Sequence, residues 1–241
     1  MTTVIGVLSR EAEMAILCAD RQATIGHAEN RAIPVGKASV RKLWTAKNGM
    51  YSFGYSGPFD DDVEKFAARM VDGSIDVERV TINGSFPELR ELNLDKLGDE
   101  APEAGNVGSF LLITRFGNEP SLYKCWPLGK VALKGLDYIG SGSGKAHEYI
   151  GARITLQKAR DYLPPLGKDR DKEREGMLLT SLECLRYAQA NDPYSSGLDL
   201  VVVTREGITD HFADLQDDFK ARVEAIAAKH TTPSPPSSAS S

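Results

Sequence analysis

The chain has 241 residues and a formal net charge of −5, with 41% hydrophobic and 26% charged residues. These values are typical of a soluble globular protein of one large domain or two small ones. The acidic balance argues against a surface that attracts nucleic acid or anionic lipid, and no apolar run approaches the ~18 residues of a membrane span.

The first half of the chain predicts strand pairs followed by helices. Short apolar runs predict four strands, at residues 4–8, 14–19, 40–44 and 49–55. The second of these runs stops at Asp20, and a polar stretch containing Pro and Gly predicts a loop at 27–37. Helices are expected at about 60–72, where apolar residues recur at helical spacing, and at about 86–97.

The second half repeats this order of strands and then helices. A hairpin at 109–126 is expected to turn at Gly117-Asn118. Three elements follow it: helices at 145–162 and about 173–190 and a strand at 198–204. A last helix is expected at 210–229, and the Ser/Pro-rich residues 231–241 are expected to be disordered. Strands and helices in separate blocks favour an α+β fold, with antiparallel sheets packed together and helices outside. We therefore expect one domain at 2–230 and a disordered tail.

The start of the chain and its cysteines indicate where the protein works. Met1 is followed at once by Thr2, Thr3 and an apolar run, so we expect no signal peptide and a cytoplasmic location. Three cysteines lie in apolar surroundings without metal-ligand or CxxC spacing: Cys18, Cys125 and Cys184. We expect them to be buried, reduced thiols, and we expect neither a metal nor another cofactor.

Six short motifs follow one another in the order found in a known family. They are Thr2–Val7, Ala19–Gly26, Val40–Leu43, Tyr55–Gly57 with Asp61, Gly140–Gly144, and Asp192–Gly197. Together they resemble the mature proteasome β subunits and the bacterial two-component proteasome homologue, over residues 2 to about 215. The resemblance implies an N-terminal nucleophile (Ntn) hydrolase with a four-layer α-β-β-α sandwich. Removal of Met1 would make Thr2 the first residue.

An N-terminal threonine combines two catalytic groups on one residue. Thr2 would supply a hydroxyl nucleophile and an α-amino base, whose ordinary pKa of about 7.7–8 leaves a useful fraction neutral at pH 7. This is the threonine–amine variant of nucleophile and base. The alternative for the motif taken alone is a small second residue of the kind common after start codons.

The resemblance assigns Lys42 and Asp20 to the surroundings of the nucleophile. The ammonium of Lys42 would favour the Thr2 alkoxide and keep the amine neutral, and Asp20 would pair with Lys42. The alternatives are a surface lysine on an edge strand and a turn residue that ends a strand. The spacing between Asp20 and Lys42 is longer than in the family, and the additional residues fall in the polar 27–37 loop.

Further roles come from the resemblance to the remaining motifs. The backbone N–H of Gly57 would stabilise the oxyanion, as such donors do in other acyl-transfer enzymes. Ser141, Asp192 and Ser195 would hydrogen-bond one another and orient the amine of Thr2. The alternatives are an ordinary turn glycine and turn or cap residues, since Asp-Pro is a plain turn signal.

The same comparison implies a site for an extended peptide. Thr24 and Gly57 would offer backbone groups to a substrate bound as an added strand. Four positions match those that line the family's first specificity pocket: Ala23, Val40, Tyr55 and Phe59. Simple core packing is an equal alternative for Val40 and Phe59.

The function implied is that of a threonine-type endopeptidase acting through an acyl-enzyme. The resemblance also implies a homo-oligomeric, self-compartmentalising barrel of stacked rings, polypeptide substrates, and an ATPase unfoldase or activator as partner. Nucleic acid and membrane are not expected as partners. Two alternatives stay open: an Ntn amidase or peptide ligase for a small or special substrate, and a non-catalytic ring subunit. Non-catalytic subunits carry a helix ahead of the first strand, whereas here a strand follows Thr2 directly.

Overall fold

The computed structural model describes residues 3–10, 12–25, 36–39, 41–57, 61–89, 92, 109–126, 129–156, 170–191 and 197–210. The strands in these ranges form two five-stranded antiparallel sheets and a two-stranded ribbon. Together with the helices, they confirm the expected mixed α+β class. No helix in the described ranges is both long and apolar enough to cross a membrane.

The first sheet has the strand order β10-β1-β2-β11-β12. Its strands are β1 (Thr3–Ser9), β2 (Met14–Ala19), β10 (Leu136–Gly140), β11 (Asp199–Thr204) and β12 (Ile208–Asp210). The predicted hairpin of β1 and β2 is confirmed, with partners from Val4↔Ala19 to Ser9↔Met14. Strand β2 is buried along its whole length because β1 and β11 flank it and its two faces pack on the helices and on the second sheet.

The second sheet is a meander in which each strand pairs with its neighbour in the chain. It contains β5 (Leu43–Thr45), β6 (Tyr51–Ser56), β7 (Ser109–Thr114), β8 (Ser121–Cys125) and β9 (Val131–Lys134). The predicted turn of the 109–126 hairpin is a short 3-10 segment, Phe116–Asn118, with Gly117 at a φ of 71°. Strands β3 (Gln22–Ile25) and β4 (Gly36–Ser39) form the separate ribbon.

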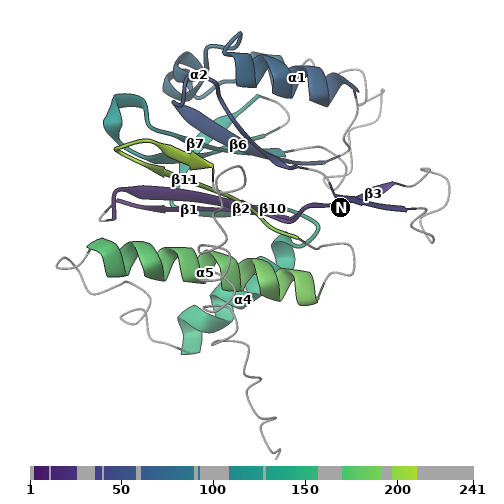
Figure 1. Cartoon of the computed structure of the whole chain (residues 1–241), viewed down its shortest axis with the longest axis vertical. Coiled ribbons are helices and arrows are strands. Elements are labelled where there is room, and N and C mark those ends of the chain that lie inside the picture. Colours follow the sequence, from purple (N-terminus) through teal and green to yellow (C-terminus); the bar gives the residue numbers. More distant parts are fainter. Residues whose placement is uncertain are drawn as a thin grey trace, which may run out of the picture.

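Helices cover the outer faces of the two sheets (Figure 1). Helices α1 (Asp61–Asp72) and α2 (Val77–Asn83) lie on the second sheet, whereas α4 (Ser143–Leu156) and α5 (Arg170–Ala190) lie on the first. A third apolar cluster fills the space between the sheets. Strand alternation divides the residues between these clusters: on β1, Val4 faces the other sheet and Ile5 faces the helices.

Several elements differ from their predicted positions. Helix α2 is present although the 77–83 segment was not expected to be helical. Of the helix expected at about 86–97, residues 86–89 and 92 are described, and 87–89 and 92 are helical. Strands β9 and β10 were also not expected. The last helix, expected at about 210–229, does not include Asp210, because this residue ends strand β12. The other residues of the expected helix and the 231–241 tail lie outside the described ranges.

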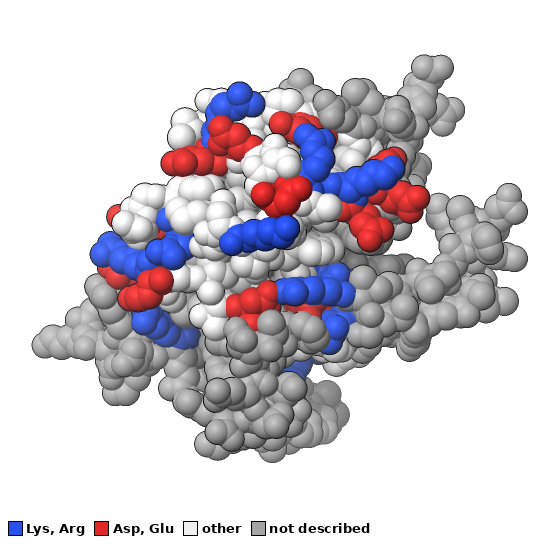
Figure 2. Space-filling view, turned by 45° about the horizontal axis from the view of Figure 1, so that its top comes forward, with Lys and Arg blue, Asp and Glu red and all other residues white. Residues whose placement is uncertain are grey.

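The strand predicted at Val40–Trp44 begins later than expected. Strand β5 starts at Leu43, so Lys42 lies just ahead of the strand rather than within it. Strand β4 also takes up the end of the predicted 27–37 loop, from Gly36 onward. On the face in Figure 2, acidic and basic side chains of the described residues lie interspersed.

Candidate active site

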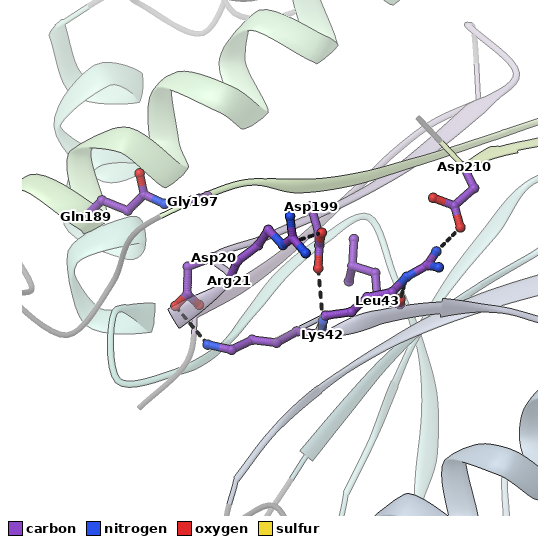
Figure 3. Close-up of polar contacts among 9 residues, drawn as sticks. Asp20, Arg21, Lys42, Leu43, Gln189, Gly197, Asp199 and Asp210 are labelled. Atoms are coloured by element: carbon purple, nitrogen blue, oxygen red, sulfur yellow. Dashed lines mark hydrogen bonds and ion pairs between the residues drawn. The ribbon is translucent and has the colours of Figure 1, made fainter. Parts of the chain in front are cut away.

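Three charged side chains are buried in the part of the chain that the structure describes, and all three meet in one place (Figure 3). Asp20, Lys42 and Asp199 are 0%, 5% and 1% exposed, respectively. Asp20 follows the end of β2, Asp199 begins the neighbouring β11, and Lys42 lies just ahead of β5 in the other sheet. The cluster therefore joins the two sheets at one end.

Asp20 connects Lys42 to the beginning of strand β1. Its Oδ2 lies 2.8 Å from the Nζ of Lys42, and its Oδ1 accepts the backbone N–H of Thr3 at 2.6 Å. The N–H of Asp20 also donates to the carbonyl oxygen of Thr3 at 3.1 Å. The hairpin register explains these contacts: Val4 pairs with Ala19, so the residues just beyond them meet. The predicted pairing of Asp20 with Lys42 is present, and it lies beside the residue that follows Thr2.

The backbone of Lys42 is held as well as its side chain. Its N–H donates to the Oδ2 of Asp199 at 2.9 Å, and its carbonyl accepts the N–H of Tyr55 at 3.3 Å. The Oδ1 of Asp199 also forms an ion pair with the Nε of Arg21 at 3.4 Å. Lys42 is therefore attached to both sheets.

Burial raises the pKa of Asp199 above its ordinary value. The hydrogen bond from the N–H of Lys42 and the charges of Arg21, Arg41 and Lys42 oppose this shift without cancelling it. Desolvation of the carboxylate therefore outweighs its favourable contacts.

The glycine-rich turn between β10 and α4 packs against Thr3. Gly140 pairs with Thr3 in the β1–β10 ladder, and a Cβ atom placed on Gly142 would overlap with the Oγ1 of Thr3. Only glycine fits at position 142 without displacement of one of the two segments. Ser141, which the resemblance assigns to the site, is an exposed residue of this turn. The turn therefore lies at the same end of β1 as Asp20.

Two other predicted site residues lie on or just after β6. Gly57 is exposed and follows the strand directly, two residues after the N–H that contacts Lys42. Tyr55 is 7% exposed and packs on Phe110 with a ring separation of 4.7 Å, and burial raises the pKa of its hydroxyl. Tyr55 thus offers little surface to a ligand, although it was predicted to line a substrate pocket.

The remaining predicted residues are described in part or not at all. Ala23 and Thr24 lie on β3 and pair with Ala38 and Lys37 of β4, while their side chains are not described. Five residues lie outside the described ranges: Thr2, Val40, Phe59, Asp192 and Ser195. Their roles stay predictions.

The cysteines are free and buried, as the sequence predicted. Burial raises the pKa of Cys125 and of Cys184 to about 12. The pKa of Cys18 is also raised, mainly by burial and to a smaller extent by the charge of the neighbouring Cys184. Because a reactive cysteine needs a thiolate, these protonated thiols are poor nucleophiles at neutral pH.

Sequence reasoning missed Asp199 and Arg21. The signal for Asp199 was a carboxylate at the head of the apolar run Leu200–Val203, where a buried charge needs a partner. Arg21 directly follows Asp20 and could have been read as that partner.

The arrangement places a fixed positive charge near the start of strand β1, where Asp20 binds both Lys42 and the backbone of Thr3. An ammonium in such buried surroundings can stabilise an anion that forms next to it. A scan against protein-family models found no match, and a search of curated proteins found no significant relative. The functional interpretation therefore depends on this geometry and on the motif resemblance.

Proposed function

We propose that the chain is an N-terminal threonine peptidase of the proteasome β-subunit type, with the four-layer sandwich of the Ntn hydrolases. One observation carries the proposal: the carboxylate of Asp20 holds both the ammonium of Lys42 and the backbone N–H of Thr3. Thr2 is joined to Thr3 by a peptide bond, so the carboxylate that binds the lysine charge also binds the residue next to the proposed nucleophile.

The chemistry begins once Met1 has been removed and the α-amine of Thr2 is free. The amine takes the proton of the Thr2 hydroxyl, and Oγ attacks the carbonyl carbon of a peptide bond. The tetrahedral intermediate then collapses, the leaving amine takes the proton, and the acyl group stays on Oγ as an ester. Water attacks this ester with the same amine as base, which releases the second product and restores the hydroxyl.

The residues around Thr2 have separable roles in this scheme. Lys42 stabilises the alkoxide and lowers the proton affinity of the amine, because like charges repel. The N–H of Gly57 is the candidate oxyanion donor, and Ser141, Asp192 and Ser195 orient the amine. The order of helices, two sheets and helices supports the fold assignment (Figure 1). Homo-oligomeric rings acting on polypeptides complete the proposal.

Labelling of the nucleophile tests the mechanism directly. Incubation with an electrophilic peptide inhibitor directed at threonine, followed by peptide mapping, should find one adduct on Thr2. Thr2→Ala should abolish both the adduct and the hydrolysis of fluorogenic peptides. Thr3→Val is the matched control: it removes the neighbouring hydroxyl, which makes no hydrogen bond with the described residues, and keeps its shape.

Each result decides between the candidate functions. Full hydrolysis by Thr2→Ala would refute the mechanism. An adduct on Thr3 would mean that Thr3, and not Thr2, is the nucleophile. A Thr2 adduct without hydrolysis of any peptide in a broad panel would favour the amidase or ligase. Failure to label Thr2 in protein shown by mass to lack Met1 would favour the non-catalytic subunit.

A further inference from the structure

The proposed chemistry does not use one of the three buried charges. Asp199 is the first residue of β11 and pairs with Ala19, the residue before Asp20. It is 1% exposed, so its carboxylate is almost fully removed from water. Placing a charge there is unfavourable unless the charge has partners, and its partners are Lys42 and Arg21.

The two carboxylates hold Lys42 at opposite ends. Asp20 contacts the ammonium at 2.8 Å, and Asp199 accepts the backbone N–H at 2.9 Å. A long lysine side chain that is held only at its tip could still shift with its backbone. Contacts at both ends restrict the lysine to few conformations, and in these the ammonium stays on Asp20.

Asp199 also contacts the residue that follows Asp20, between strands β2 and β3. Its Oδ1 lies 3.4 Å from the Nε of Arg21, the residue directly after Asp20. Gly197, two residues before Asp199, has a φ of 77°, and a Cβ there would press on the side chain of Arg21. Residue 197 is thus fitted closely against Arg21, and Figure 3 shows the Arg21 side chain directed at Asp199.

We propose that Asp199 is a positioning residue, whose carboxylate sets the place of Lys42 relative to Asp20 and so to the start of strand β1. Its catalytic consequence rests on the proposed threonine-peptidase function. Asp199 touches no reacting atom in this scheme and acts only through Lys42 and Arg21. Loss of its contacts leaves the nucleophile in place and misdirects the charge that activates it.

Two substitutions separate the contacts of Asp199. Asp199→Ala removes the acceptor for the N–H of Lys42 and the partner of Arg21, whereas Asp199→Asn keeps an acceptor oxygen and loses only the charge. We expect Asp199→Ala to lower kcat about tenfold to a hundredfold, the effect of a small misplacement in an active site. KM should change little, because Asp199 acts through Lys42 and does not contact the substrate in this scheme. Asp199→Asn should recover most of the lost kcat.

A second readout does not depend on activity. Lys42 is 7% exposed at its side chain, so a lysine-acylating reagent should modify it slowly in the wild-type protein. Modification followed by mass spectrometry should be severalfold faster at Lys42 in Asp199→Ala and near the wild-type rate in Asp199→Asn. Lys65, which is 76% exposed, serves as an internal reference that should not change.

Asp137→Ala is the matched control for loss of an ion-paired aspartate from a strand. Asp137 lies on β10, the edge strand of the first sheet, and pairs with Lys124 at 2.8 Å and Lys134 at 3.6 Å. We expect this variant to keep the wild-type kcat and the wild-type modification rate at Lys42.

The possible results distinguish this proposal from the one on which it rests. Unchanged modification of Lys42 in Asp199→Ala, or an unchanged kcat with Thr2-dependent activity, would overturn the positioning role. Faster modification of Lys42 in a protein without Thr2-dependent activity would support the positioning role and refute the peptidase. If Asp199→Ala does not fold, Asp199→Ser replaces it, because the shorter side chain withdraws the acceptor oxygen from the N–H of Lys42. An unchanged modification rate at Lys42 together with an unchanged kcat in that variant would overturn the positioning role.

Discussion

Replacing Lys42 with methionine would leave a buried carboxylate without its cation. The Nζ of Lys42 lies 2.8 Å from the Oδ2 of Asp20, and Asp20 is fully buried. At this distance the attraction is about 6 kcal/mol for an effective dielectric constant of about 20. Desolvation of both groups offsets much of it, but removal of one partner typically costs about 3–5 kcal/mol, because the other charge stays buried. We expect Lys42→Met to lose about that much free energy of unfolding.

A double variant separates this stability effect from catalysis. Asp20→Asn combined with Lys42→Met removes both charges, while the asparagine oxygen can still accept the N–H of Thr3 and methionine fills the volume of the lysine stem. Urea unfolding at neutral pH should therefore show the double variant to be much more stable than Lys42→Met. Peptide hydrolysis should be lost in both, because in the proposed mechanism Lys42 and Thr2 act as a unit whose effects do not add.

Two results would contradict this reasoning. A Lys42→Met protein as stable as the wild type would mean that Asp20 is not left as an uncompensated charge. Hydrolysis by the double variant at a rate within a few-fold of the wild type would mean that the lysine charge does not activate the nucleophile.

Three further predictions test neighbouring parts of the site. Gly142→Ala should destabilise the protein by about 1–3 kcal/mol through overpacking against Thr3, whereas Gly144→Ala, with open space around its Cβ, should be neutral or stabilising in thermal unfolding. Protein that retains Met1, identified by intact mass, should fold but hydrolyse no peptide, because an amide nitrogen is not basic; full activity there would exclude the amine as base. For Asp199, whose pKa burial raises, the folded state binds the proton more tightly than the unfolded state, so stability rises as pH falls through the raised pKa. Urea unfolding from about pH 8 to about pH 4 should show the wild type gaining stability relative to Asp199→Asn, and no such gain would contradict the sign of the shift.

The sequence predicted the elements whose apolar pattern is regular. The short apolar runs of β1 and β2 and the helical spacing of Val63, Phe66 and Met70 gave correct positions. Helix α2 was missed because it is short and rich in β-branched residues, which favour strands. Its caps were the available signal: Asp76 accepts the N–H of Arg79, and Gly84 is left-handed with a φ of 63°.

The candidate site was predicted less completely, because its partners come from different strands. The pairing of Asp20 with Lys42 was expected from the motif resemblance alone. Lys42 was placed inside a strand, where its N–H would belong to the ladder, whereas the strand begins at Leu43 and that N–H binds Asp199. This contact depends on β11 lying beside β2, and local sequence carries no information about that neighbour.

The balance of charge at the site is a reason to regard it as functional. Asp20 and Asp199 oppose Lys42 and Arg21, so the four side chains sum to zero. A buried ion pair is a weak source of stability, since apolar residues of equal volume often serve as well. Asp20 neutralises Lys42 and Asp199 neutralises Arg21, and the additional contact of Asp199 with the backbone N–H of Lys42 is explained if the position of Lys42 matters. In the proposed reaction the proton passes from the hydroxyl of Thr2 to the amine of the same residue. The total charge of the site then stays constant, and the fixed ammonium of Lys42 stabilises the alkoxide without a charge entering from solvent.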